Sequence, residues 1–175
     1  LVSGTPVDCI LIALGAIIKP NIKPEVIFSG INLGANLGND IYYSGTVGAA
    51  REGALNKIKS ISLSIVKDFE NDKINWSVVK VQGKEIIKNL LKMTWKFSYY
   101  VNINFPNVSS KNVRGIKFTY KGKRKPGKIV KEFKTLKNKK EYLIDTTRTK
   151  ELEKNNTDSE MIQKGYISIS IHSVD

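Results

Sequence analysis

The stretch that decides the fold reads VIFSGINLGANLGNDIYYSGT and runs from Val26 to Thr46. Its first four residues, 26–29, form a short apolar run between a proline and a glycine, which is typical of a buried parallel strand. Residues 30–45 contain four glycines and almost no periodicity, which indicates a long loop that carries function. Residues 46–55 are rich in small side chains and predict a helix that lies close against a sheet.

The segments on either side continue this alternation of helix and strand. Thr5 and Asp8 can cap a helix whose apolar residues, 9–18, lie all round it, so we expect that helix to be buried. Downstream, the periodicity predicts strands at 60–66 and 99–105 and a helix at 76–93. This order predicts a parallel α/β sheet with right-handed crossovers. Later strand candidates predict β-hairpins on the edge of the main sheet and a final strand, at residues 116–120, 129–133, 141–144 and 166–171.

The composition limits the classes of protein to which this chain can belong. The chain has 175 residues, of which 41% are hydrophobic and 26% charged, and this suits one domain with a sizeable core. No apolar stretch reaches the roughly 18–20 residues that cross a bilayer, so we expect no membrane partner. The single cysteine, Cys9, excludes an internal disulfide and a cysteine-based zinc site, and we expect a cytoplasmic protein.

Positive charge is concentrated in the second half of the chain. The formal net charge is +13, and residues 111–150 hold fifteen of the 29 Lys and Arg residues but only three acidic ones. Such a segment attracts phosphate-rich partners such as nucleotides or RNA. A Lys-rich segment without an RNA-binding signature of interleaved aromatic residues is instead typical of a solvated surface. The sequence therefore does not favour specific nucleic acid binding.

The loop at 30–45 has the features of a ligand site. It leaves the carboxyl end of a predicted strand, where ligands bind in open α/β sheets. It ends in Ser44, Gly45 and Thr46 at a helix start, where free N–H groups attract anions and a glycine would let a phosphate approach. Asn32 and Asn36 carry amide oxygens, which are hard, neutral ligands suited to Mg²⁺ or Mn²⁺. Two plainer interpretations stay open: the Asn residues occupy left-handed turn positions, and the hydroxyls only cap the helix.

Two further polar residues each allow two interpretations. Asp40 is either a ligand or a turn former. His172 is the only histidine and lies near the C-terminus on an alternating strand. It is either an exposed strand residue or a proton donor to a leaving group, because histidine titrates near neutrality.

The pattern SGINxGxNxGxDxxYSGTVxAAxEG at residues 29–53, preceded by GTPxDC at residues 4–9, resembles the survival protein SurE family. Residues 101–106 (VNINFP), Gly122-x-Arg124, Thr157-Asp158 and residues 165–168 (GYIS) resemble its later parts, so the resemblance spans nearly the whole chain. It implies an α/β, three-layer Rossmann-like fold with a mostly parallel central sheet, lacking its first strands, plus a C-terminal β-hairpin extension. Residues 1–175 would form one domain, with an α/β core part at 1–110, a basic hairpin extension at 111–165 and a terminal strand at 166–175.

The resemblance also implies an activity. The family consists of metal-dependent phosphomonoesterases that hydrolyse nucleoside 5′- and 3′-monophosphates. By this resemblance Asn32 would bind Mg²⁺ or Mn²⁺. Ser44, Gly45 and Thr46 would hold the substrate phosphate, with Asn36 beside it. The resemblance further implies a homo-oligomer, a dimer or tetramer with exchanged C-terminal arms.

One part of the family's pattern does not occur in this sequence. The pattern opens with a strand followed by Asn-Asp-Asp-Gly, whose two Asp residues supply the carboxylates for the metal, and a Ser after the next strand adds a ligand. We therefore expect this chain to be an N-terminally truncated form that is inactive or impaired as an enzyme, with apolar faces left open beside residues 26–29. The alternative is a non-catalytic remnant or an interaction module.

Overall fold

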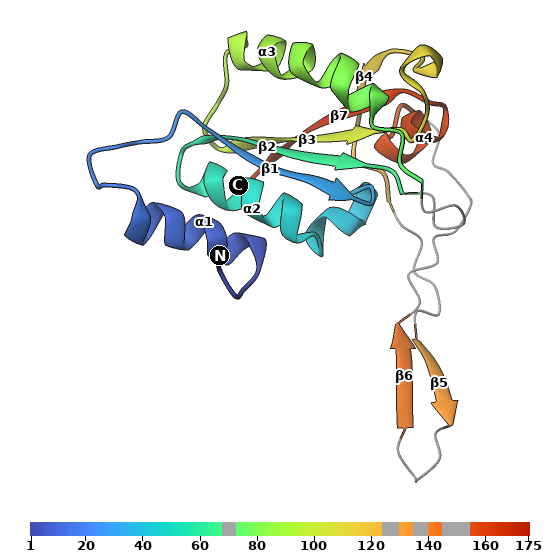
Figure 1. Cartoon of the computed structure of the whole chain (residues 1–175), viewed down its shortest axis with the longest axis horizontal. Helices are drawn as coiled ribbons and strands as arrows, with labels where there is room; N and C mark the ends of the chain where they lie inside the picture. Colours follow the sequence, from blue (N-terminus) through green and yellow to red (C-terminus); the bar gives the residue numbers. More distant parts are fainter. Residues whose placement is uncertain (68–72, 124–129, 135–139, 145–154) are drawn as a thin grey trace.

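The computed structural model describes residues 1–67, 73–123, 130–134, 140–144 and 155–175 (Figure 1). The helices are α1 (Pro6–Ile12), α2 (Gly45–Leu55), α3 (Lys84–Lys92) and α4 (Asp158–Gln163). The strands are β1 (Val26–Leu33), β2 (Lys59–Ile65), β3 (Tyr99–Phe105), β4 (Ile116–Phe118), β5 (Val130–Lys134), β6 (Lys140–Ile144) and β7 (Ile167–Ser173). Two π-helical turns, Ala13–Ile17 and Val79–Gly83, and two 3-10 turns, Gly38–Tyr42 and Ser110–Asn112, complete the described elements. None of the described helices is long and apolar enough to span a bilayer.

Five strands form one sheet in the order β1-β2-β3-β7-β4. Strands β1, β2 and β3 run parallel, β7 is antiparallel to β3, and β4 is parallel to β7. Helices α1 and α2 lie on one side of the sheet and α3 on the other, so the molecule has three layers (Figure 1). The predicted α/β fold with a mostly parallel sheet is confirmed.

The two faces of this sheet differ in chemistry. Under α3, strands β2, β3 and β7 contribute the apolar side chains of the main core, Ile61, Leu63, Ile65, Val101, Ile103, Phe105, Ile167 and Ile169. On the opposite face, the alternate positions of the same strands are buried polar residues, namely Ser60, Ser62, Ser64, Asn102, Asn104, Ser168 and Ser170. We call this second set the polar face. Because buried polar groups need hydrogen-bond partners, a network of such bonds must hold this face together.

Small residues let α2 approach the polar face closely, as the sequence predicts. Ala50 and Ala54 are buried, and a Cβ added at Gly53 would collide with Ser60 and lie 2.7 Å from Ile27. On its other side α2 meets α1, where a Cβ at Gly48 would lie 3.0 Å from Val7. Glycine and alanine therefore bring the helix close to both of its neighbours.

One extra residue in β1 sets which of its side chains reach the polar face. Ser29 pairs with Ser62 and Asn32 pairs with Ser64, so three residues of β1 step past two of β2. This bulge directs Asn32 to the polar face, whereas the preceding residue, Ile31, packs against the apolar core. Gly30 lies in the bulge with φ +134°, and a Cβ there would collide with the backbone of β2.

Two predictions for the N-terminal part are wrong. Strand β1 continues through residues 30–33, which the sequence assigns to the loop, because the bulge accommodates Gly30 within the strand. Neither β1 nor α1 contains a buried residue, although we expect both to be buried. The physical reason is position, since β1 is an edge strand and α1 packs on α2 along one side only.

The C-terminal part differs from the prediction in one respect. Strand β4 joins the edge of the main sheet, but β5 and β6 pair as a separate two-stranded sheet, which Figure 1 draws apart from the five strands. The predicted hairpin therefore exists, but not on the sheet edge. Residue 129 of the predicted strand and Arg124 of the family pattern lie outside the described residues. The terminal strand is confirmed as β7.

Candidate functional site

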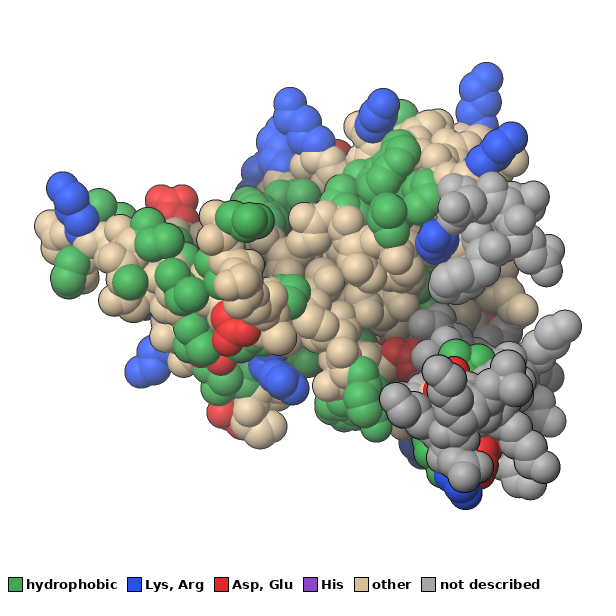
Figure 2. Space-filling view, turned by 60° about the horizontal axis from the view of Figure 1, so that its bottom comes forward, with side chains coloured by type: hydrophobic (Ala, Val, Ile, Leu, Met, Phe, Trp, Pro, Cys, Tyr) green, Lys and Arg blue, Asp and Glu red, His purple; other side chains and the backbone are tan. Residues whose placement is uncertain are grey.

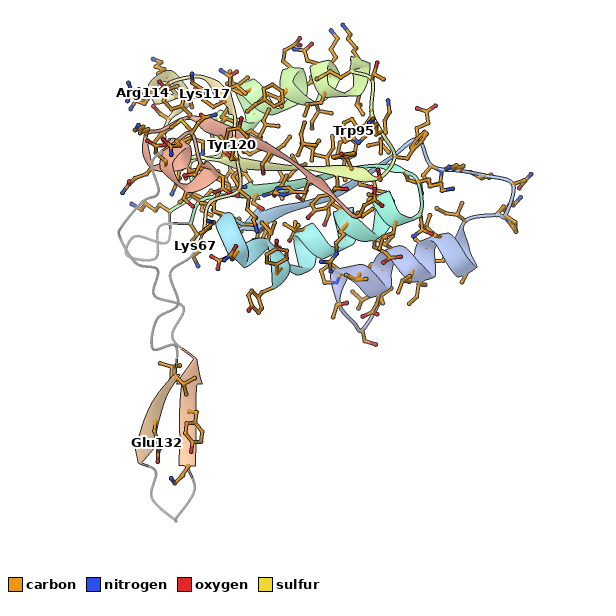
Figure 3. The ribbon with its side chains drawn as sticks, turned by 180° about the vertical axis from the view of Figure 1, so that it is seen from behind. Lys67, Trp95, Arg114, Lys117, Tyr120 and Glu132 are labelled. Atoms are coloured by element: carbon orange, nitrogen blue, oxygen red, sulfur yellow. The ribbon has the colours of Figure 1, made fainter. Side chains whose placement is uncertain are left out.

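The candidate site lies at the edge where β1, β2 and β3 end. Lys67, just after β2, marks this edge, and Trp95, just before β3, lies toward the opposite one (Figure 3). Helix α2 begins at the same edge, because the segment from Gly34 to Ser44 returns directly from β1 to the helix (Figure 1). Strand ends, a connecting loop and a helix start therefore meet here, as the sequence predicts.

Asn36 anchors the connecting loop on the polar face. Its side-chain amide donates to Ser64 Oγ at 2.7 Å, and its backbone N–H donates to Asn104 Oδ1 at 2.8 Å. Its carbonyl accepts from Asn102 Nδ2 at 2.9 Å and from Asn104 Nδ2 at 3.0 Å. Asn36 is itself buried. The family resemblance puts Asn36 beside the phosphate, but in this structure Asn36 fixes the loop to β2 and β3.

Asn32 lies next to this anchor, opposite Ser64 in the sheet. Its amide nitrogen donates to the carbonyl of Gly34 at 2.7 Å, which orients the side chain. Within the described residues its Oδ1 accepts no hydrogen bond, and the residue is half-buried. The amide oxygen of Asn32 is therefore held in place and remains free to meet a ligand.

The interpretation of both asparagines as left-handed turn residues is wrong. The positive φ angles of this region belong to Gly30, Gly34 and Gly38, whereas Asn32 and Asn36 have none. Glycines thus take the backbone positions that other residues avoid, and the asparagines are left for side-chain contacts.

The start of α2 presents donors for an anion. Ser44 is the N-cap, and its Oγ accepts from the N–H of Val47 at 3.1 Å, so the capping interpretation of Ser44 is confirmed. In the described part of the chain the N–H groups of Gly45 and Thr46 have no acceptor, and both residues are half-buried. Two oriented donors at the positive end of a helix favour an anion.

Gly45 also has a packing reason to be glycine. A Cβ on it would lie 2.9 Å from Cδ and Cγ of Pro6, the first residue of α1. The missing side chain thus makes room for α1, which is a different use from the phosphate approach that the sequence predicts.

Asp158, a residue without a predicted role, connects the loop to the C-terminal part. This fully buried carboxylate accepts from the N–H groups of Gly38 at 2.8 Å, Gly122 at 3.0 Å and Ser159 at 2.7 Å. Asp158 follows the N-cap Thr157, so the sequence indicates a helix start at this position. The sequence holds no local signal for partners that lie 120 and 36 residues away.

Lys121 lies over the 3-10 turn of the same loop. Its ammonium donates to Tyr42 Oη at 2.6 Å and to Asn39 Oδ1 at 3.3 Å, and lies 4.4 Å from the centroid of the Tyr42 ring. This residue from the predicted basic segment therefore brings a positive charge to the loop that precedes α2.

His172 lies on the polar face but toward the other end of the sheet. It pairs with Tyr100, stacks on that ring with centroids 5.3 Å apart, and its Nε2 lies 2.8 Å from Ser170 Oγ. Tyr100 precedes Asn104 by four residues, or about 13 Å of strand. The structure therefore does not bring His172 beside Asn32. Burial lowers the pKa of His172, the Asp158 carboxylate opposes this shift, and Lys121 adds to it.

The described residues do not form a complete metal site. Within them, no three side chains of His, Cys, Asp or Glu gather closely enough to hold an ion. Asn32 supplies one neutral oxygen, whereas Mg²⁺ takes about six oxygen ligands with carboxylates among them. Asn32 suits such an ion only as one ligand among others.

Comparisons with known proteins find matches over most of this chain. Residues 1–128 match the family model for survival protein SurE. The chain is 37% identical over 169 residues to 5′-nucleotidase SurE of Paramagnetospirillum magneticum, which covers 97% of this chain and 64% of that protein. It is also 37% identical over 168 residues to 5′/3′-nucleotidase SurE of Wigglesworthia glossinidia brevipalpis, with 96% and 64% covered.

One solved structure extends the likeness to three dimensions. The crystal structure of the SurE protein from Aquifex aeolicus superposes with a TM-score of 0.80 at 32% identity, and the match covers 99% of this chain and 68% of that one. The chain thus spans slightly under two thirds of the two curated relatives named above and slightly over two thirds of the solved structure.

Proposed function

Because this chain belongs to the survival protein SurE family, we propose that its site serves the hydrolysis of nucleoside 5′- and 3′-monophosphates. The relatives from Paramagnetospirillum and Wigglesworthia bear the names 5′-nucleotidase and 5′/3′-nucleotidase. The substrate is then a phosphomonoester with a nucleoside as its leaving group. A cytoplasmic location and assembly into dimers or tetramers accompany this proposal as predictions from the sequence.

A single observation supports the proposal most strongly. At one edge of the sheet, an unpartnered amide oxygen on Asn32 and two unpartnered N–H groups on Gly45 and Thr46 flank the loop that Asn36 anchors. In our proposal the N–H groups bind the phosphoryl oxygens, because oriented donors at a helix start stabilise negative charge. The Ser44 hydroxyl caps the helix that carries these donors, because it accepts from the N–H of Val47.

We further propose that a divalent ion, Mg²⁺ or Mn²⁺, takes part, with Asn32 as one ligand. Since the described residues supply no carboxylate cluster, the remaining ligands must come from outside them. We therefore expect the chain on its own to bind a phosphate ester better than it hydrolyses one. Hydrolysis by this chain alone should be weak or absent.

The absence of an acidic cluster in the described part also favours a second candidate function, that of a non-catalytic interaction module. A measurement of phosphate release distinguishes the hydrolase from the interaction module. Release from AMP that needs Mg²⁺ or Mn²⁺, and that falls at least tenfold in Asn32→Ala, supports the hydrolase. AMP binding without any release, with either metal, supports the module.

Binding of AMP tests the phosphate site independently of turnover. The amide resonances of Gly45 and Thr46 should shift on addition of AMP, but not on addition of adenosine, which lacks the phosphate. Thr46→Pro removes one N–H while keeping a residue that the first helical turn tolerates, and Thr46→Ala removes only the hydroxyl. A hydrogen bond to a charged group contributes about 1.5–3 kcal/mol, so Thr46→Pro should weaken AMP binding roughly 10–100-fold.

Thr46→Ala, the matched variant, tests whether the backbone N–H or the side-chain hydroxyl of Thr46 binds the phosphate. Thr46→Ala should bind AMP more tightly than Thr46→Pro, and circular dichroism should report α2 intact in both. Equal affinities for AMP and adenosine, or unchanged resonances of Gly45 and Thr46, would exclude the helix start as the phosphate site.

A further inference from the structure

A row of four lysines runs along the outer side of the helix that covers the apolar core. Lys80, Lys84, Lys88 and Lys92 follow one another at intervals of four residues through the turn Val79–Gly83 and α3, and all four are exposed. We call these four residues the lysine row. Side chains that end in nitrogen project from α3 away from the sheet (Figure 3). Lys and Arg side chains also project from the upper margin of the space-filling view, with few acidic side chains among them (Figure 2).

The helix geometry keeps this row straight. In an α-helix four residues slightly exceed one turn, so a row with this spacing slowly winds round the helix. The π turn at Val79–Gly83 takes more than four residues per turn, and it therefore turns the row back between Lys80 and Lys84. Each residue adds about 1.5 Å along the axis, so neighbouring lysines lie about 6 Å apart and the row is about 18 Å long.

The lysine row has almost no negative charge near it in the sequence. Residues 73–97 contain six lysines and one acidic residue, Glu85. In the described part of the chain no lysine of the row makes an ion pair, whereas Lys164 pairs with Glu160 at 2.7 Å over the same four-residue spacing. Like charges four residues apart repel and destabilise a helix. The row therefore weakens α3, and a bound polyanion would relieve this repulsion.

An aromatic side chain extends the row at its start. Trp76 lies four residues before Lys80, and its carbonyl accepts from the N–H of Lys80 at 3.0 Å, so Trp76 begins the same helical stretch. Trp76 is 37% exposed. Proteins that bind single-stranded nucleic acid without sequence preference combine cations that follow the phosphate backbone with aromatic rings on which bases stack. The lysine row and Trp76 supply both parts.

We propose that the lysine row and Trp76 bind single-stranded nucleic acid without sequence preference. The spacing of about 6 Å is close to the separation of neighbouring phosphates along an extended strand, so each lysine meets one phosphate. A base at the end of this stretch stacks on Trp76. The row lies on α3, on the opposite side of the sheet from α2 (Figure 1), and the proposal does not rest on nucleotide hydrolysis.

An anionic membrane surface is the competing partner for such a row. Peripheral helices bind membranes by burying their apolar face in the lipid. The apolar face of α3 is not available for this contact, because Ile86 and Leu90 are buried in the core of the protein. A line of charges also matches a linear polyanion better than a plane of lipid headgroups. The structure therefore favours nucleic acid.

The probe is an oligouridine of about twelve nucleotides with hydroxyl groups at both ends, added without metal. It contains no phosphomonoester, so its binding is independent of the phosphate site proposed at the start of α2. Four phosphate contacts predict that affinity falls about 50-fold between roughly 50 and 200 mM salt, because each contact with a single strand releases about 0.7 counterion. Stacking on Trp76 should quench tryptophan fluorescence, and this quenching should be absent in Trp76→Leu.

Two double variants that remove the same charge test the lysine row. Lys84→Gln/Lys88→Gln removes two of its lysines, and Lys19→Gln/Lys57→Gln removes two exposed lysines outside it. The first variant should lower the loss of affinity over the same salt range to about 7-fold, and the second should leave it at about 50-fold. All four side chains are exposed, so circular dichroism should report both variants folded.

Any of four results would overturn the proposal. The oligouridine could fail to bind at low salt, or the quenching could persist in Trp76→Leu. The two double variants could show the same affinity and the same salt dependence, which would place the contact elsewhere, such as in the basic segment 111–150. Vesicles of anionic lipid could bind where the oligouridine does not, and then a membrane would be the partner. None of these results depends on hydrolysis, so the proposed function would still need its own test.

Discussion

Replacement of Asp158 by alanine should lower the free energy of unfolding by about 3–5 kcal/mol. The carboxylate accepts three backbone N–H groups, from Gly38, Gly122 and Ser159, at 2.7–3.0 Å in a fully buried position. A hydrogen bond to a charged group contributes about 1.5–3 kcal/mol, and relaxation of the loop recovers part of the sum. Because domains are stable by only about 5–15 kcal/mol, the variant should lose a large share of its stability.

Urea unfolding measures this loss. With a slope near 2 kcal/mol per molar urea, the midpoint should fall by about 2 M at an unchanged slope. Asp175→Ala is the control, because Asp175 is exposed and its N–H, not its carboxylate, makes the hydrogen bond to Ser173. In Asp158→Ala the amides of Gly38 and Gly122 should exchange faster than in the control. A loss below about 1 kcal/mol, or unchanged exchange at both glycines, would refute the view that Asp158 fastens the loop.

Three further predictions concern α2 and the polar face. Gly45→Ala should push Pro6 away and cost about 1–3 kcal/mol by thermal unfolding, whereas Gly15→Ala, with no atom within 4 Å of the new Cβ, should cost nothing. Ser44→Ala should cost about 1 kcal/mol in urea and Ser44→Asn much less, because only the second keeps a cap for Val47. Burial lowers the pKa of His172 below 6.5, so the unfolded chain binds more protons just below that pH. The free energy of unfolding should therefore rise with pH between the lowered pKa of His172 in the folded chain and 6.5, and this stability should be lost below that range. His172→Gln should flatten this pH dependence. An identical pH profile in the variant and the wild type would contradict this prediction.

The sequence predicts most of the element order for a physical reason. Strands β2 and β3 alternate along their whole length, and the glycine-rich α2 has the small residues that close packing needs. Each of these signals is local. By contrast, the end of β1 is missed because Gly30 and Asn32 interrupt its apolar run, while the bulge that keeps them in the strand depends on pairing with β2.

Part of the candidate site can also be predicted from the sequence, because some of its signals are local. Residues Ser44–Thr46 lie at a helix start, and the cap of Ser44 follows from local chemistry. The contacts of Asn36 with Ser64 and Asn104 join strands that are 28 and 68 residues away, so no local pattern reveals them. The exposure of α1 likewise depends on what packs against it, which its own apolar residues cannot specify.

The bulge in β1 means that the direction of every later side chain in this strand depends on one extra residue. Without the bulge, regular pairing after Ser29 would put Ile31 opposite Ser64 and Asn32 opposite Ile65. Isoleucine would then stand among serines, and the amide of Asn32 would be driven into hydrocarbon without a partner. Removal of Gly30 would instead put Ile31 opposite Leu63 and leave Asn32 opposite Ser64, so a chain that lost this glycine should keep both side chains on their present faces.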